Sequence, residues 1–327
     1  MPQTLLKRHW AFGTYNYWGS RSYDRALAEF HRALDARPND AQFLHSIAVV
    51  ERRMGKWTDC LRNLENAARY DPRNRDVLGD LMFTHLYLRR YREAADWAER
   101  CLAQSPDDAW TAFGKVELSL LADGDMEKAK ILADSIPLRN YTPGVSMWSI
   151  DATTMGILDN FRQLVLARMS CETPADSLTR YLASIVPFHS ASENPAEHRR
   201  RVACADSARA IVVRYLQDLP DDPGFHGLLG LTLAVAGKSD SAIQEGEKAV
   251  RMLPLSKDVL DGSQLIGNLA VIYVLAGKHD AAIDQLDRLL SIPSELSVAL
   301  LGVDPTWTPL RSNPRFQKLL EQPDKVF

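Results

Sequence analysis

The segment Gly237-Lys238-Ser239 has the residue types that end a phosphate-binding loop, so it is the first candidate for chemistry in this sequence. Such a loop wraps its backbone amides around a phosphate, and the spacing of its two glycines is fixed. The preceding glycine, Gly230, lies too far upstream, because six residues intervene. A similar Gly-Lys pair recurs at Gly277. We therefore interpret both segments as turns that contain a glycine and a solvated lysine.

The histidines and cysteines do not form a metal or nucleophile pattern. None of the eight histidines stands four residues from another, and the sequence lacks an HExxH motif. The four cysteines are far apart without a CxxC pair, which is typical of reduced thiols in a cytosolic protein. No serine or cysteine stands in a recognisable nucleophile motif. We expect a protein without catalytic residues, metal or cofactor, and therefore not an enzyme.

The charge balance argues against nucleic acid as the partner. The chain has 39 Lys+Arg against 42 Asp+Glu, a net charge of −3, whereas nucleic-acid proteins usually carry a basic excess. Its basic clusters are short: Arg52-Arg53, Arg89-Arg90 and Arg199 to Arg201. The first two fall near expected helix ends, where cations complement the helix dipole.

Neither a membrane span nor an export signal is predicted. The longest apolar stretch, 265–277, includes Asn268 and is shorter than the roughly 20 residues that a span requires. The N-terminal residues reach Lys7 and Arg8 before an apolar signal core could form. We expect a cytoplasmic protein that does not bind membranes.

A 34-residue period reveals the elements that must position any functional residue. Pro38, Pro72 and Pro106 are 34 residues apart. Three further sets keep the same step: Tyr23, Trp57 and Tyr91; Ala26, Cys60 and Ala94; Ala33, Ala67 and Cys101. A fixed period of this length indicates a repeat architecture.

Each period encodes two helices that fold back on each other. Residues 40–54 and 57–70 both carry apolar side chains at three- and four-residue steps, and Gly55-Lys56 separates them. The small residues let the two helices approach closely, and the proline ends the unit. Because one hairpin cannot bury its apolar face alone, the units must stack.

These residues resemble the tetratricopeptide repeat. The first unit matches that family best, through Trp10, Tyr17, Ala26, Phe30, Ala33 and Pro38. Residues 108–137 form a degenerate fourth unit, and two further units end at Pro254 and Pro293. The resemblance implies an all-α, right-handed superhelix of stacked antiparallel hairpins with a C-terminal capping segment.

The chain divides into four parts on this basis. We expect a repeat block at 1–137, an irregular helical segment at 138–222, further hairpins at 223–293 and a capping tail at 294–327. Helices are expected at 148–170, 174–186 and 195–217, and Trp307 and Phe316 should cover the last apolar edge near Leu286 and Leu290. The C-terminal part resembles the helical-repeat tails of bacterial signalling proteins, namely serine/threonine kinases, adenylate cyclases and winged-helix regulators.

The family resemblance also implies a partner site. In tetratricopeptide repeat proteins the first helix of each hairpin lines a concave groove that binds a protein or peptide. The matching candidates here are Arg8, Tyr15, Trp18, His45, Val49, Arg52, Phe83 and Phe113. Members that clamp a terminal carboxylate have lysine, asparagine and arginine in the groove, whereas this chain has Tyr15, Val49 and Phe83 at one recurring position. We expect an apolar segment with some negative charge as the ligand.

Several alternatives stay open at this point. The leading interpretation is a non-catalytic scaffold that binds a partner protein or peptide in its groove. The chain could instead be an orphan or truncated regulatory tail of a signalling enzyme or transcription regulator, or, less favoured, an enzyme with a site in 138–222. The groove aromatics could instead pack against the chain's own middle helices, and the sequence leaves the oligomeric state open.

Overall fold

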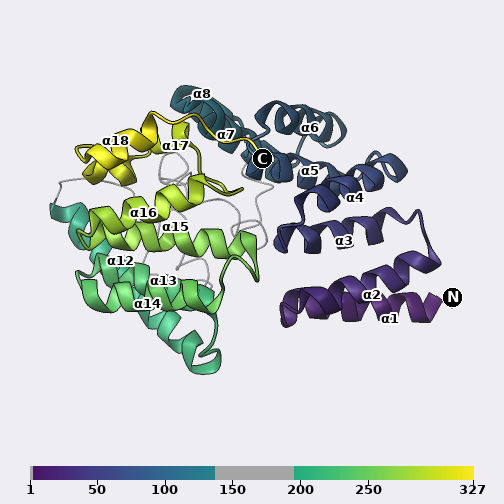
Figure 1. Ribbon diagram of the computed structural model, residues 1–327, viewed down its shortest axis with the longest axis horizontal. Helices are drawn as coiled ribbons and strands as arrows, with labels where there is room; N and C mark the ends of the chain where they lie inside the picture. The colour runs from purple at the N-terminus through teal and green to yellow at the C-terminus, as the bar shows by residue number, and fades with distance from the viewer. Residues whose placement is uncertain (1–2, 137–194) are drawn as a thin grey trace.

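The computed structural model describes residues 3–136 and 195–327, and every regular element in these ranges is a helix. The described elements form two blocks, one from each range (Figure 1). The predicted all-α fold of stacked antiparallel hairpins is confirmed for the described residues. The expected helices at 148–170 and 174–186, and most of the 138–222 segment in which an enzyme site was considered, lie outside them.

The N-terminal block consists of four consecutive hairpins. Their helices are α1 (Gln3–Thr14), continued by the π-helix η1 (Tyr15–Gly19), and α2 (Tyr23–Ala36); α3 (Ala41–Arg53) and α4 (Trp57–Tyr70); α5 (Arg75–Tyr87) and α6 (Tyr91–Gln104); α7 (Ala109–Asp123) and α8 (Met126–Ser135). Each hairpin packs on the next through its neighbouring helices. The expected helices at 40–54 and 57–70 are α3 and α4, to within a residue at each end.

Helix caps recur with the same period as the prolines. The side chains of Asp40, Asn74 and Asp108 accept hydrogen bonds from backbone amides at the starts of α3, α5 and α7. These amides have no partner within their own helix, so each cap fixes where a hairpin begins. Inside the hairpins, Ala26 and Ala94 are fully buried, which allows the close packing of the two helices.

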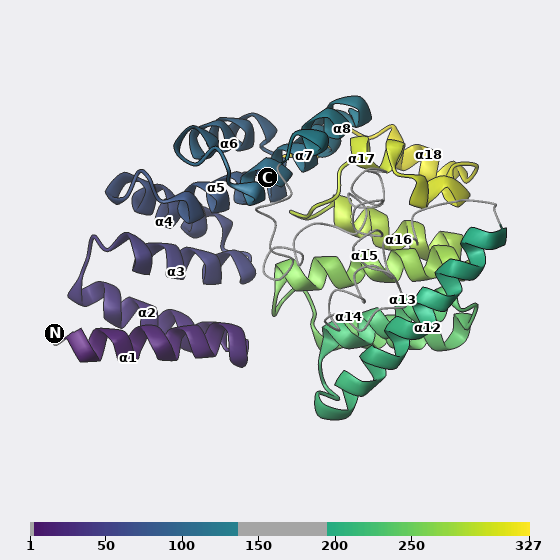
Figure 2. The same ribbon diagram turned by 180° about the vertical axis from the view of Figure 1, so that it is seen from behind.

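The C-terminal block contains two more hairpins and a cap. Its helices are α12 (Pro195–Asp218), α13 (Pro223–Val235) and α14 (Ser239–Met252), α15 (Val259–Leu275) and α16 (His279–Leu290), α17 (Val298–Val303), the 3₁₀ helix η4 (Pro305–Leu310) and α18 (Pro314–Leu320). Figure 2 shows α12 lying obliquely against the hairpin of α13 and α14, and it contacts α13. Trp307 and Phe316 are buried in the same core cluster as Leu286 and Leu290.

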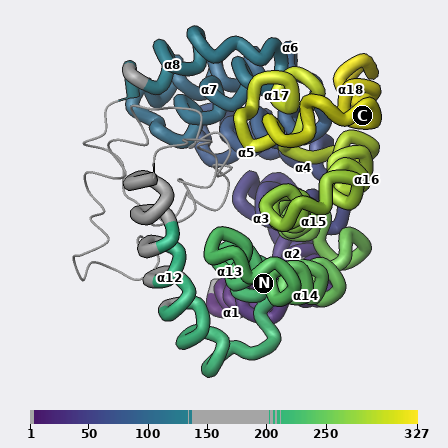
Figure 3. Tube along the Cα trace, turned by 90° about the vertical axis from the view of Figure 1, so that its left-hand side faces the viewer, coloured from purple at the N-terminus to yellow at the C-terminus, as the bar shows by residue number. Residues whose placement is uncertain are grey.

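The two blocks pack against each other through the first helices of the N-terminal hairpins. Helix α15 contacts α3, and α17 contacts α7 (Figure 3). One apolar core accordingly combines Phe83 and Leu120 of the N-terminal block with Leu231 and Ile266 of the C-terminal block. The chain end then returns to the end of α5, where the amide of Phe327 donates to the carbonyl of Leu88.

None of the helices within residues 3–136 and 195–327 is both long and apolar enough to cross a membrane.

Candidate interaction surface

Two recurring positions on the first helices of the N-terminal hairpins, here called the groove positions, become more buried along the block. The first position holds Tyr15, Val49, Phe83 and Glu117, and the second holds Trp18, Arg52, Leu86 and Leu120. Tyr15 and Trp18 are 66% and 70% exposed, whereas Phe83 is 4% exposed and Leu120 is fully buried. The side chains at the groove positions are therefore exposed in the first hairpin and buried in the third and fourth hairpins.

A buried carboxylate at the N-terminal cap of α15 binds residues of the first two hairpins. Asp258 is fully buried, and its side chain accepts hydrogen bonds from the hydroxyl of Tyr23 and, at 2.8 Å, from Arg53. The same carboxylate caps α15 by accepting from the amides of Leu260 and Asp261. Burial and the neighbouring Asp258 carboxylate raise the pKa of Tyr23, which keeps its hydroxyl a donor. Because a buried charge needs such partners, this contact fixes the register of α15 against α3.

Two further ion pairs join Asp261 to the same surface. Arg53 reaches the Asp261 carboxylate at 2.7 Å, and Arg21 reaches it at 3.2 Å. Arg53 also donates to the hydroxyl of Tyr17 and lies over its ring. Arg21 and Arg53 are thereby committed to the start of the chain's own helix α15.

Arg89 holds the end of α16 and the segment after it against the third hairpin. Its side chain is fully buried. It donates to the carbonyls of Leu289, Leu290, Ile292, Leu296 and Lys325 and to the hydroxyl of Ser294, at 2.9 to 3.2 Å. Burial lowers the pKa of this guanidinium, but an arginine stays charged at neutral pH. The hydrogen bonds to these carbonyls replace the hydration that the guanidinium loses on burial.

Neighbouring residues of α5 complete this contact. The hydroxyl of Tyr87 hydrogen-bonds to Glu295, and the amide of Ser294 donates to the Tyr87 carbonyl. Phe83 packs on Trp110 with ring centroids 4.4 Å apart. The inner side of the third hairpin is therefore filled by the chain itself.

His45 and Arg52 take part in a network within the N-terminal block. Both contact the Asp80 carboxylate at 2.6 Å, and Arg52 also donates to Thr84. Burial alone would raise the pKa of Asp80, but Arg52 and His45 hold it well below its ordinary value. The network ties α3 to α5 and occupies both candidate residues.

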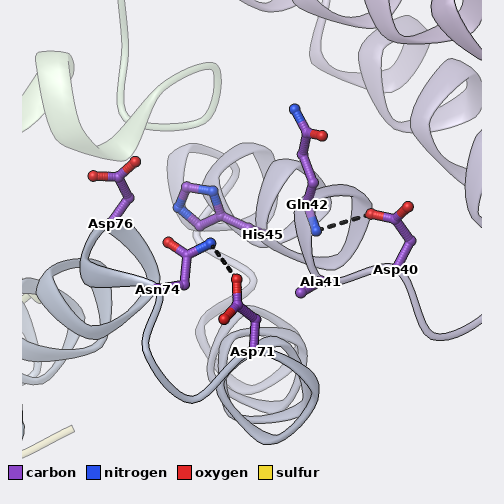
Figure 4. Close-up of a pocket in the computed structure, with 7 residues that line it drawn as sticks. All are labelled: Asp40, Ala41, Gln42, His45, Asp71, Asn74 and Asp76. Atoms are coloured by element: carbon purple, nitrogen blue, oxygen red, sulfur yellow. Dashed lines mark hydrogen bonds between the residues drawn. The ribbon is translucent and has the colours of Figure 1, made fainter.

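An oxygen-rich pocket of about 540 Å³ lies between the starts of α3 and α5 (Figure 4). It is lined by Asp40, Ala41, Gln42, His45, Asp71, Asn74 and Asp76. Asp40 and Asn74 serve as helix caps, and Asn74 also donates to Asp71. Asp40, Asp71 and Asn74 of this pocket are accordingly used by local structure.

The described residues contain no group of three or more histidines, cysteines or acids placed to hold a metal ion. Cys60 is buried between helices, where burial raises the pKa of its thiol to about 12. At neutral pH this thiol is protonated, and the thiolate is the nucleophilic form. Cys60 is therefore a packing residue.

One side of α1 and η1 stays uncovered, and we call it the first-hairpin face. It consists of Arg8, Ala11, Phe12, Tyr15 and Trp18, all of them exposed. The first four are spaced as neighbours on one side of a helix. Trp18 follows in the π-helix η1, with its ring edge-on to that of Tyr17 and the ring centroids 4.7 Å apart. Tyr15 lies over Gly19, where a Cβ atom would come within 3.2 Å of the ring.

The structure thus separates the eight candidate residues. Arg8, Tyr15 and Trp18 are exposed; His45, Val49 and Arg52 are partly buried; Phe83 and Phe113 are buried at 4% and 3%. The expectation that Tyr15, Trp18, Phe83 and Phe113 share one open surface is wrong for the last two. They belong to the core that the C-terminal block completes. Contact of any of the eight with a partner stays a prediction.

Sequence reasoning missed Arg89 and Asp258, which join the two blocks. Arg89 stands at the turn position that Gly55 occupies in the second hairpin, and both have a left-handed backbone. An arginine where a glycine recurs was the available signal, because the strained position needs a compensating contact. Asp258 carried no periodic signal.

No family model matches the chain, and no curated protein matches its sequence. Among similar solved structures is a tetratricopeptide repeat protein from Parabacteroides merdae, with a TM-score of 0.37 and 12% identity, covering 93% of this chain and 100% of that one. The type IV pilus biogenesis factor PilW has a TM-score of 0.34 and 14% identity, covering 86% and 98%. The tetratricopeptide repeat domain of P58(IPK) has a TM-score of 0.29 and 14% identity, covering 94% and 99%. At such low scores the likenesses carry no argument about function, and the fold description rests on this chain's own helices.

Proposed function

We propose that the chain is a non-catalytic scaffold that binds a partner protein through the first-hairpin face. The observation that carries the proposal is the exposure of Tyr15 and Trp18 at groove positions whose equivalents in the third hairpin are buried. The chain's own residues cover the groove positions partly in the second hairpin and almost completely in the third and fourth, which supports the first-hairpin face as the place for another protein.

The chemistry of this face suits protein recognition. Large exposed aromatic side chains are enriched among the residues that dominate binding energy, since they offer much contact area at low entropy cost. Tyr15 rests on Gly19 and Trp18 rests on Tyr17, so both rings are partly oriented before binding. Single-turn π-helices such as η1 often occur at functional sites.

Affinity capture from extracts of the source cells tests the proposal. The full chain should retain a partner that the double variant Tyr15→Ala/Trp18→Ala loses, with an unchanged helical circular dichroism spectrum. Tyr70→Ala is the matched control, because Tyr70 is an exposed aromatic at the end of α4. Equal capture by all three proteins would reject the first-hairpin face as the binding site.

The identity of the captured protein decides between two forms of the proposal. A kinase, a cyclase or a transcription regulator would support a regulatory tail of a bacterial signalling protein, acting in the cytoplasm. A protein of another class would leave a general scaffold.

A further inference from the structure

Helix α15 of the same chain already packs on the N-terminal block beside the first-hairpin face, and its contacts indicate what kind of helix this surface binds. Its first turn presents two carboxylates, Asp258 and Asp261, to Arg53 and Arg21. Its Val259 side chain approaches the turn at Gly55, where an added Cβ would lie 3.1 Å from Val259 Cγ1. The groove therefore accepts the start of a helix that combines carboxylates with an apolar side chain.

The first-hairpin face likewise combines cations with an apolar surface, and it lies on the hairpin next to the one that α15 contacts. The segment from α1 through η1 contains Lys7 and Arg8 but no acidic residue. Neither cation has an ion-pair partner among the residues that the structure describes. Arg21 and Arg53 are already engaged by Asp261, so a new ligand would meet Lys7 and Arg8.

Resting on the proposed function, we infer that the partner contributes an amphipathic helix with acidic residues in its first turn. The apolar side of this helix packs on Tyr15 and Trp18, and its acidic turn meets Arg8. The bound helix extends the interface that α15 already makes with the second hairpin. Opposite charge at the rim speeds association and sets orientation, while the aromatic anchors supply most of the affinity.

A second copy of this chain fits the face less well. In a symmetric dimer the same patch meets itself. The segment from α1 through η1 contains no acidic residue, so the same patch of a second copy offers no carboxylate to Lys7 and Arg8. Charge complementarity therefore favours an acidic partner over self-association.

Two labelled synthetic peptides test the inference by fluorescence anisotropy with the full chain. Both are short amphipathic helices with leucine and phenylalanine on one side; one has Asp and Glu in its first turn, and the other has Lys at the same places. We expect the acidic peptide to bind at least about tenfold more tightly. Trp18→Ala should weaken its binding by about tenfold or more. Arg8→Glu should remove or reverse the preference, and Tyr70→Ala should change nothing.

The outcomes separate the inference from the proposed function. If both peptides bind equally and both depend on Trp18, the acidic chemistry is wrong while the first-hairpin face remains the docking surface. If neither peptide binds, the inference is overturned, and the capture experiment still decides the proposed function. If binding ignores Trp18→Ala, the peptides bind elsewhere and the inference falls. A dimer in sedimentation equilibrium that Trp18→Ala dissociates would assign the face to a second copy and overturn the inference.

Discussion

Arg21 and Arg89 occupy the same turn position in the first and third hairpins, and both have positive backbone φ values, 48° and 54°. Glycine takes this position in the second hairpin, at Gly55 with φ 72°. A left-handed backbone costs a residue with a Cβ about 1–2 kcal/mol. Both arginines reach across to the C-terminal block, Arg21 to Asp261 and Arg89 to carbonyls at the end of α16. These contacts offset the strain.

Replacing Arg89 by glycine should destabilise the protein even though glycine suits the backbone. The change removes a fully buried guanidinium that donates to five carbonyls and to the Ser294 hydroxyl, which should lower the free energy of unfolding by roughly 3 kcal/mol or more. Arg21→Gly is the matched control. It removes one partly exposed ion pair and relieves strain, so it should stay within about 1 kcal/mol of the parent. Urea denaturation measures both, and similar losses would contradict the assigned role of Arg89.

Enlarging a small residue in the hairpin interior should strain the stack. Ala94 is fully buried between helices, and overpacking costs about 1–3 kcal/mol. Ala94→Leu should therefore lower the melting temperature. Lys238→Ala, in the exposed turn before α14, should leave it nearly unchanged. A melting temperature that responds equally to both changes would argue against this packing of the hairpins.

The contribution of the C-terminal cap to stability can be tested with a pair of phenylalanines, one on the cap and one in α1. Phe316 is fully buried on the cap, whereas Phe12 is 52% exposed on the first-hairpin face. Phe316→Ala should cost about 3–5 kcal/mol through the lost contacts and the cavity. Phe12→Ala should change stability by about 0.5 kcal/mol or less. Chemical denaturation distinguishes them, and a Phe316→Ala protein as stable as the parent would show that the cap adds little.

Acid should weaken the Asp80 network in a defined direction. Arg52 and His45 hold the folded-state pKa of Asp80 below the value of about 3.9 expected in the unfolded chain. The contribution of Asp80 is therefore complete above about pH 4 and is lost as the pH falls toward the lower folded-state pKa.

The variant Asp80→Asn tests this dependence. It should unfold more easily at neutral pH and show a shallower loss of stability between pH 4 and more acidic values. Asp76→Asn, at an exposed carboxylate of the same helix, serves as the control. If Asp80→Asn kept the full acid dependence, another carboxylate would be responsible.

The sequence predicted the local structure of the N-terminal hairpins well because each hairpin is built from signals close together in the chain. Pro38 and Pro72 mark the unit ends, and the buried Ala26 and Ala94 mark the helix contacts. The same periodicity misled the expectation for the groove. Tyr15 and Phe83 occupy equivalent positions in the repeat. Only the fold shows that Phe83 is buried in the core shared with the C-terminal block, whereas Tyr15 is exposed.

Long-range pairs explain the difference. Asp258 contacts Tyr23 and Arg53, and Glu295 contacts Tyr87, across more than half of the chain. Such contacts follow no period, because each depends on how two distant blocks come together. The sequence therefore could not predict that the first hairpin stays exposed, although it did identify the aromatic residues Tyr15 and Trp18 as candidates.

The link between Arg89 and the segment 289–296 changes how this repeat array should come apart. In an open solenoid each unit contacts only its neighbours, so the ends can fray independently. Here the third hairpin is tied to residues some two hundred positions later in the chain. Opening either block removes partners from the other, so the array should melt as one cooperative unit. Because these contacts join segments that are distant in the sequence, they should also slow folding relative to an array with neighbour contacts alone.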